Sequence, residues 1–281
     1  GRTLLTSDGT TILGADDKAG IAEILTMIER IQTENRPNGT ICVAFTPDEE
    51  IGMGAEHFNL DQFGAEYAYT LDGDSEGEIQ YENFNACKAE FEIRGFNVHP
   101  GEGKDTMINA SLVAIEINNC LPSMETPRGT EDYEGFYHLI SMQGEVGEAK
   151  LNYIVRDHDK NGFEERKKTL RLIEKNLNAK WGEGTVTLKI TDQYLNMKEI
   201  VEEHMHLIDH AKKACEAAGV APLILPIRGG TDGCQLSFKG LPCPNLGTGG
   251  HAFHGPYEHI SVEGMEKSVE LLLALIQEYT K

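Results

Sequence analysis

The sequence predicts an α/β protein with a mostly parallel central sheet and an inserted, ferredoxin-like α+β domain. Strand-like and helix-like segments alternate at both ends of the chain, which is typical of βαβ units and a parallel sheet. The middle follows the order strand–helix–strand–strand–helix–strand, complete in about 110 residues, which is that of a ferredoxin-like sandwich. We therefore divide the 281 residues into a first domain built from 1–83 and 194–281, and an insert at 84–193.

The first domain is predicted from three short strands and one helix before residue 83. Residues 10–15, 40–46 and 65–71 are short, mostly apolar runs, typical of buried strands. Residues 18–34 have apolar side chains at helical spacing, which predicts an amphipathic helix. Its apolar face consists of Ile21, Ile24, Leu25, Ile28 and Ile31. Strand–helix–strand at this spacing predicts parallel pairing.

Later elements follow from the same patterns. In the insert we expect strands at 89–95, 136–141, 148–156 and 185–191, and helices at 108–119 and 163–179. After the insert we expect a helix at 199–218, an apolar run at 223–227, a helical turn at 234–238 and a final helix from 262 onward. The residues after the insert therefore again alternate between helices and strands, as in an α/β domain.

Acidic residues follow each of the three early strands. They are Asp16 and Asp17, Asp48 to Glu50, and Asp72 and Asp74. If the strands are parallel neighbours, these acids share the sheet edge where open α/β folds bind ligands. Adjacent carboxylates repel one another, so such an edge favours a bound cation. A single acidic strand end is more often a helix cap or a solvated turn, and that alternative stays open from the residues alone.

Glu49 and Glu50 can take different roles at a metal site, one as ligand and one as general base. Adjacent side chains point in different directions, so one carboxylate can bind a metal while its neighbour acts on water as a general base. Zinc accepts carboxylate and imidazole ligands, and a histidine in the late glycine-rich loop could join the acids. His251 and His254 are the two candidates there.

Composition limits the partners. The formal net charge of −21 argues against nucleic acid and anionic membranes, because phosphate groups would be repelled. No apolar run approaches the length of a membrane span. The six cysteines form no C-x-x-C pair, which favours a reducing, cytoplasmic location over a disulfide framework.

Five motifs together resemble the M20 co-catalytic zinc aminopeptidases. They are Leu13–Gly20 (LGADDKAG), Pro47–Gly52 (PDEEIG), Tyr69–Gly73 (YTLDG), Asn97–Gly101 (NVHPG) and Arg228–Gly233 (RGGTDG). The resemblance covers the whole chain in the family's order. It implies a zinc-peptidase catalytic domain with an inserted lid, two zinc ions, and release of the N-terminal residue of tripeptides by metal-bound hydroxide.

The resemblance also implies a role for each matching residue. Asp16 would bridge the two zinc ions, Glu50 and His254 would complete one site, and Asp72 would belong to the other. Glu49 would be the general base. His99 would stabilise the oxyanion, and Arg228 would hold the substrate carboxylate. We also assign Asn109 to substrate binding. The family spacing to Glu258 favours His254 over His251, and the peptide after Asp16 is expected to be cis.

One family motif does not occur in this sequence. The family carries a His-x-Asp motif in an amino-terminal segment, and no such motif is found here. We therefore expect one zinc site to be incomplete in this chain and the missing segment to act as its partner. A homodimer also stays open. The alternatives are another M20 hydrolase, such as a dipeptidase or an N-acyl amino acid deacylase, and a catalytically silent fragment.

Overall fold

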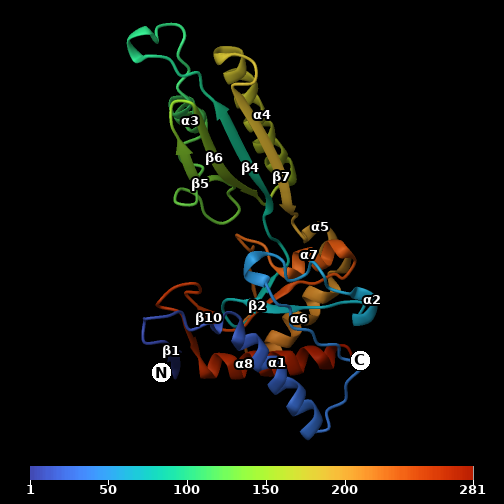
Figure 1. Cartoon of the computed structure of the whole chain (residues 1–281). Helices are drawn as coiled ribbons and strands as arrows, with labels where there is room; N and C mark the ends of the chain where they lie inside the picture. The colour runs from blue at the N-terminus through green and yellow to red at the C-terminus, as the bar shows by residue number, and fades with distance from the viewer. Residues whose placement is uncertain (281) are drawn as a thin grey trace. The chain divides into compact units, whose positions relative to one another are not determined.

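The computed structural model describes residues 1–280 and contains two compact units (Figure 1). One combines residues 1–83 with the residues from Met197 onward, and we call it the split unit. The other is Phe84–Asn196, the inserted unit. No helix in residues 1–280 is long and apolar enough to cross a bilayer.

The strands of the split unit form two small sheets. The first has the order β1-β11-β10 and is antiparallel. The second has the order β2-β9-β3-β8, with β2/β9 and β3/β8 parallel and β3/β9 antiparallel. The strands are β1 (Leu4–Thr6), β2 (Thr70–Gly73), β3 (Glu78–Gln80), β8 (Leu223–Ile224), β9 (Asn245–Gly247), β10 (Gly250–His251) and β11 (His259–Ser261).

Helices cover these sheets, and α8 packs against both α1 and α6. The α-helices are α1 (Ala15–Thr33), α2 (Leu60–Phe63), α5 (Lys198–Val201), α6 (His206–Ala217), α7 (Asp232–Lys239) and α8 (Val262–Glu278). Two short 3₁₀ turns are η1 (Glu49–Ile51) and η3 (Glu202–His204). The amphipathic patterns predicted the presence of α1 and α8 correctly. The expected apolar face of α1 is partly wrong, because Ile21 and Leu25 are exposed. Its buried side includes Glu23 and Met27 together with the expected Ile31. The single helix expected at 199–218 is wrong, because α5, η3 and α6 share that range.

Two of the three expected early strands do not form. Residues 10–15 are irregular up to the start of α1, and residues 40–46 lie outside any strand. A strand requires a partner for its backbone groups. Within the described part of the chain, residues 39–46 make no backbone–backbone hydrogen bond. Val43 and Phe45 remain 38% and 48% exposed. Of the expected strand at 65–71, only its end forms, as part of β2.

The inserted unit has the expected βαββαβ order and one antiparallel sheet, ordered β5-β6-β4-β7. Its elements are β4 (Asn85–Arg94), η2 (Pro100–Glu102), α3 (Ala110–Asn119), β5 (Phe136–Gly144), β6 (Glu148–Asp157), α4 (Lys160–Trp181) and β7 (Val186–Tyr194). Alternate residues of β4, from Cys87 to Ile93, are buried, because one sheet face packs on the helices. Both α3 and α4 contribute to this core.

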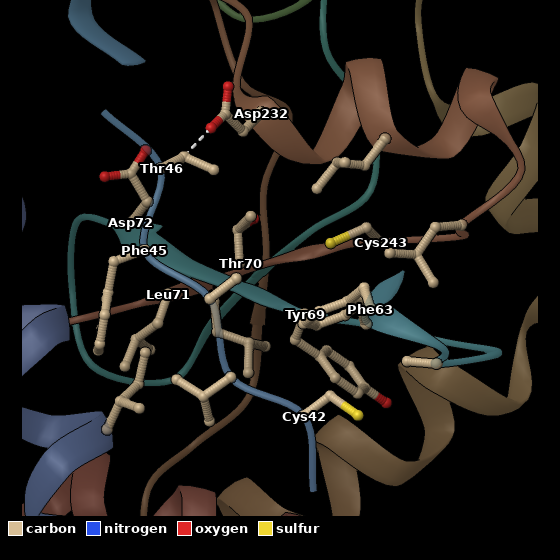
Figure 2. A pocket seen from close by; sticks show the side chains of 18 of the residues that line it. Cys42, Phe45, Thr46, Phe63, Tyr69, Thr70, Leu71, Asp72, Asp232 and Cys243 are labelled. Atoms are coloured by element: carbon tan, nitrogen blue, oxygen red, sulfur yellow. Dashed lines mark hydrogen bonds between the residues drawn. The ribbon is translucent and has the colours of Figure 1, made fainter. Parts of the chain in front are cut away.

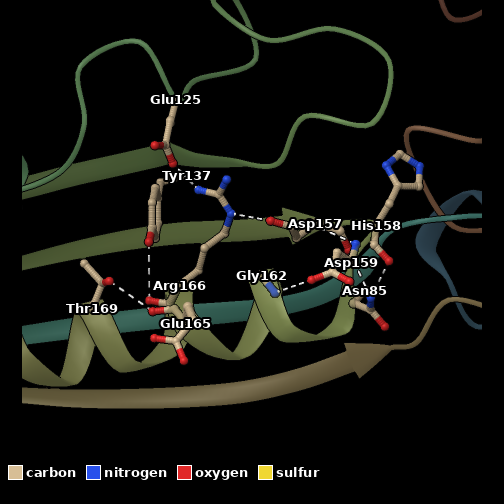
Figure 3. Close-up of polar contacts among 10 residues, drawn as sticks. All are labelled: Asn85, Glu125, Tyr137, Asp157, His158, Asp159, Gly162, Glu165, Arg166 and Thr169. Atoms are coloured by element: carbon tan, nitrogen blue, oxygen red, sulfur yellow. Dashed lines mark hydrogen bonds and ion pairs between the residues drawn. The ribbon is translucent and has the colours of Figure 1, made fainter.

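A polar network joins α4 to the sheet of the inserted unit (Figure 3). The Arg166 guanidinium donates to Asp157 at 2.7 Å and also pairs with Glu125. Asp157 accepts the backbone N–H of Asp159 at 2.9 Å, and Asp159 caps α4 through the N–H of Gly162 at 2.7 Å. These partly buried charges therefore have partners within their own unit.

Candidate metal centre

The loop before α1 holds Asp16 through a buried carboxylate. Glu258 is 1% exposed and accepts the backbone N–H groups of Gly14 at 2.7 Å and Asp16 at 3.1 Å. These backbone hydrogen bonds outweigh the effect of burial and lower the pKa of Glu258. The Asp16–Asp17 peptide bond is cis, as the resemblance implies. Glu258 thus fixes the backbone that carries Asp16.

Glu49 and Glu50 lie in a tight turn, η1. Asp48 before it and Gly52 after it both have left-handed backbone, with φ of 62° and 73°. The N–H of Met53 donates to the carbonyl of Asp48 at 3.0 Å and closes the turn. Glu49 is half-buried and Glu50 is exposed, so the two carboxylates have different surroundings.

The imidazole of His254 contacts both Asp16 and Glu50. Its Nε2 lies 2.9 Å from Asp16 Oδ2 and 3.1 Å from Glu50 Oε2. Among residues 1–280, Asp16, Glu50 and His254 form the one group of three or more metal-ligand side chains whose donor atoms all lie within 4.8 Å. His251, the competing histidine, instead lies beside His259, with ring centroids 5.4 Å apart.

Carboxylates crowd around these donors. Burial, followed by repulsion from neighbouring acids, raises the pKa of Glu49 to about 7, of Asp17 to about 8 and of Asp72 to about 9. The strongest repulsion on the Glu49 carboxylate comes from Asp232. Asp16 repels the carboxylates of Glu49, Asp17 and Asp72. Such a cluster is costly while its acids are ionised and lack a counter-ion.

The donor set fits a metal ion. Burial lowers the pKa of His254, but the carboxylates of Glu50 and Asp16 together raise it above its usual value. Two carboxylates and one imidazole within mutual reach are ligands that zinc accepts. A divalent cation would relieve the repulsion that raises the pKa values of Glu49, Asp17 and Asp72.

A cavity of about 810 Å³ lies beside the cluster within the split unit. Residues 39–46, residues 63–72 and one face of α1 line it. Figure 2 shows a polar end, where Thr46 lies between Asp72 and Asp232, and an apolar end with Cys42 and Tyr69. The cavity thus runs from the acidic cluster along the segment that lacks strand partners.

Three other predicted site residues lie elsewhere. His99 and Asn109 belong to the inserted unit, where they cap η2 and α3. His99 Nδ1 accepts the N–H of Gly101 at 3.2 Å, and Asn109 Oδ1 accepts the N–H of Leu112 at 3.3 Å. Arg228 is half-buried in the split unit, in the loop before α7.

The sequence assigned no role to two buried acids of the site. Glu258 holds the Asp16 loop, and Asp232, at the start of α7, accepts a hydrogen bond from Thr46 at 2.6 Å. Each is an isolated acid in a loop-rich region, which in sequence looks like a surface residue. A carboxylate within three residues of a loop glycine, Gly230 for Asp232 and Gly255 for Glu258, is the signal that could have found them.

Comparison with known proteins identifies the family of this chain. Residues 11–278 match the family described as "Peptidase family M20/M25/M40". The chain belongs to this peptidase family. Its predicted membership and its enzyme class, a metallopeptidase, are thereby confirmed, as is the α/β fold.

The relatives agree with this assignment. The chain is 55% identical over 280 residues to "Peptidase T" of Halothermothrix orenii, covering 99% of this chain and 69% of that protein. It is 56% identical over 282 residues to "Peptidase T" of Clostridium perfringens strain ATCC 13124, covering 100% of this chain and 70% of that protein. The crystal structure of the aminopeptidase PepT from Bacillus cereus ATCC 10987 has a TM-score of 0.85 and 28% identity, covering 99% of this chain and 74% of that one.

Proposed function

We propose that this chain carries the zinc centre of an aminopeptidase that releases the N-terminal residue of tripeptides. The observation that supports this most is the meeting of Asp16, Glu50 and His254, which come from three distant parts of the sequence. The high identity to proteins named Peptidase T, over nearly the whole chain, supports the substrate class.

The ligand assignment follows from the donor set. Asp16, Glu50 and His254 would hold one zinc ion, and Asp16 with Asp72 would contribute to a second. Zinc, when bound, polarises a carbonyl and lowers the pKa of water toward ~7. Glu258 would hold the backbone of the ligand common to both sets, Asp16, in place.

Glu49 is the group we assign to proton transfer. Its carboxylate is next to the ligand Glu50 but is half-buried, whereas Glu50 is exposed. A base at this position takes the proton from the attacking water and delivers it to the leaving amine, which accounts for both proton movements of peptide hydrolysis. Glu49 therefore does not need to bind metal to act.

His99, Asn109 and Arg228 are assigned to the substrate. Because His99 Nδ1 accepts the N–H of Gly101, its proton resides on Nε2, which can donate to a developing oxyanion. Because Asn109 Oδ1 accepts from Leu112, its amide nitrogen is left as the donor for a substrate carbonyl. The Arg228 guanidinium suits bidentate binding of a carboxylate.

We further propose that the cavity receives an extended segment of the type that carries the family's His-x-Asp motif. Residues 39–46 lack backbone partners in the described chain, and β2 pairs with β9 on one edge alone. A strand between them would satisfy both sets of backbone groups and bury the apolar end of the cavity. Its histidine would then complete the Asp72-side zinc site.

A substrate panel tests the activity. The zinc-loaded protein, alone and mixed with a polypeptide carrying the family's amino-terminal segment, is assayed on tri-, di- and tetrapeptides and on N-acyl amino acids. We expect tripeptides to be cleaved at the first bond with the highest kcat/KM. Preference for dipeptides or N-acyl amino acids would overturn the substrate class, and no turnover in either preparation would indicate a silent module.

A further inference from the structure

One face of α7 contacts the segment that contains Glu49 and Glu50. Asp232, Gln235 and Lys239 are spaced three and four residues apart, so they lie on the same side of the helix. Asp232 Oδ2 accepts the Thr46 hydroxyl at 2.6 Å. Gln235 Nε2 donates to the carbonyl of Gly52 at 3.1 Å. These two contacts bracket the turn from both ends.

The contacts continue beyond the turn. Lys239 Nζ donates to the backbone carbonyl of Ala55 and, at 2.8 Å, to that of Glu56. Ala55 is fully buried and belongs to an apolar cluster with Leu236 of α7. The segment after the turn is therefore fixed to α7 by apolar packing as well as by hydrogen bonds.

Asp232 is enclosed at this junction. It is 4% exposed, and its Oδ1 has no hydrogen-bond partner among residues 1–280. A Cβ added to Gly54 would lie 2.2 Å from Asp232 Oδ2, so the backbone of Gly54 packs directly against the carboxylate. A buried carboxylate that keeps one oxygen unsatisfied costs stability. Stability alone therefore does not explain why an acid occupies this position.

We propose that Asp232 is a positioning residue for peptide hydrolysis, which with Gln235 fixes both ends of the turn that carries Glu49 and Glu50. The inference rests on the proposed function, because it takes Glu49 as the base and Glu50 as a ligand. Asp232 acts on the turn through the Thr46 hydroxyl. A displacement of a reacting group by 1 Å can cost about 10²-fold in rate. Its loss should therefore lower kcat and leave KM nearly unchanged.

The test is a matched pair at Thr46 in the zinc-loaded enzyme. Thr46→Val keeps the shape and removes the donor, whereas Thr46→Ser keeps the hydroxyl. At saturating zinc, we expect Thr46→Val to lower kcat about 10- to 100-fold with KM within about twofold, and Thr46→Ser to match the unmodified enzyme. Asp232→Asn should lower kcat similarly, and the double variant Thr46→Val/Asp232→Asn should be no slower than the slower single variant.

Hydrogen exchange separates this inference from the proposed function. The N–H groups of Gly52 and Met53 donate to the carbonyls of Glu49 and Asp48 within the turn. We expect both to exchange faster in Thr46→Val and Asp232→Asn than in Thr46→Ser, with α8 unchanged. Equal exchange in Thr46→Val and Thr46→Ser would overturn the positioning role, even if no peptide is cleaved. If Thr46→Val fails to fold, Gln235→Met takes its place. It removes the hydrogen bond to the Gly52 carbonyl from a half-buried site, and kcat and hydrogen exchange then test the positioning role in the same way.

Discussion

The two units differ in how far their charged side chains and backbone groups are paired. In the inserted unit, four strands form one continuous antiparallel sheet, and Arg166 is paired with both Asp157 and Glu125 (Figure 3). In the split unit, residues 39–46 have no backbone hydrogen-bond partner among residues 1–280, and several carboxylates crowd around Asp16. The inserted unit pairs these charges within itself, whereas the split unit holds the groups to which we assign a bound cation, a substrate and an added strand.

This difference shows where function costs stability. Unpaired strand edges and clustered like charges are unfavourable unless a ligand compensates them. Both occur here along one cavity, with the clustered acids at its polar end and residues 39–46 lining its length. Substitutions of Glu49 and of the three candidate metal ligands should therefore change activity more than folding, and substitutions in the polar network of the inserted unit should do the reverse.

The largest effect is expected for Glu49→Gln. It removes the proposed base and keeps the shape, so turnover should fall by about 10³-fold or more while zinc content stays the same. Peptide hydrolysis and metal analysis of the same preparation measure both quantities. Glu29→Gln, which changes an exposed acid on α1, is the control. Full activity of Glu49→Gln would remove Glu49 from the mechanism.

Arg166→Leu should have the next largest effect, and on stability. It leaves the partly buried Asp157 without its charge partner, which should cost about 2–4 kcal/mol of unfolding free energy in the inserted unit. Chemical denaturation followed by a probe in that unit measures it. Lys150→Gln, which breaks the exposed pair with Glu92, should leave the denaturation midpoint unchanged. Equal effects of the two substitutions would contradict the comparison between these pairs.

Glu23→Gln should have a smaller, pH-dependent effect. Glu23 is 1% exposed, both its oxygens lack partners among residues 1–280, and burial followed by repulsion from Asp17 raises its pKa to about 9. The folded state keeps a proton that the unfolded chain releases near pH 4.5, so Glu23 makes stability decline as pH rises from about 4.5 to about 9.

The glutamine variant removes this titration. It should match the unmodified protein at pH 4.5 and be more stable by about 1–3 kcal/mol at pH 8. Thermal unfolding at several pH values measures the difference. Parallel stability curves across that range would show that folding does not raise the pKa of Glu23.

Local patterns in the sequence predicted much of the fold. The presence of α1 and α8 and the βαββαβ order of the insert follow from spacing alone, because each depends on neighbouring residues. The buried face of α1 does not follow from it, since Ile21 and Leu25 are exposed. Residues 40–46 show the limit of this reasoning. Their β-branched and apolar side chains favour extended backbone, but a pattern does not reveal whether a partner strand is present.

The site was predictable to a lesser degree. Acids at strand ends indicated a cation, and motif resemblance selected Asp16, Glu50 and His254, which the structure brings together. Glu258 and Asp232 were assigned no role, because each acts through a hydrogen bond to a residue more than 180 positions away. Glu258 accepts the backbone N–H of Gly14, and Asp232 accepts the Thr46 hydroxyl. Long-range contacts of this kind leave no periodic signal.

Zinc binding to matched histidine variants tests the central claim most directly. The purified chain, His254→Gln and His251→Gln are dialysed against zinc, and bound metal per chain is measured. We predict about one or more tightly bound zinc ions in the unmodified chain and in His251→Gln, and loss of that zinc in His254→Gln. No zinc in the unmodified chain, or equal zinc in His254→Gln, would contradict a metal centre at Asp16, Glu50 and His254.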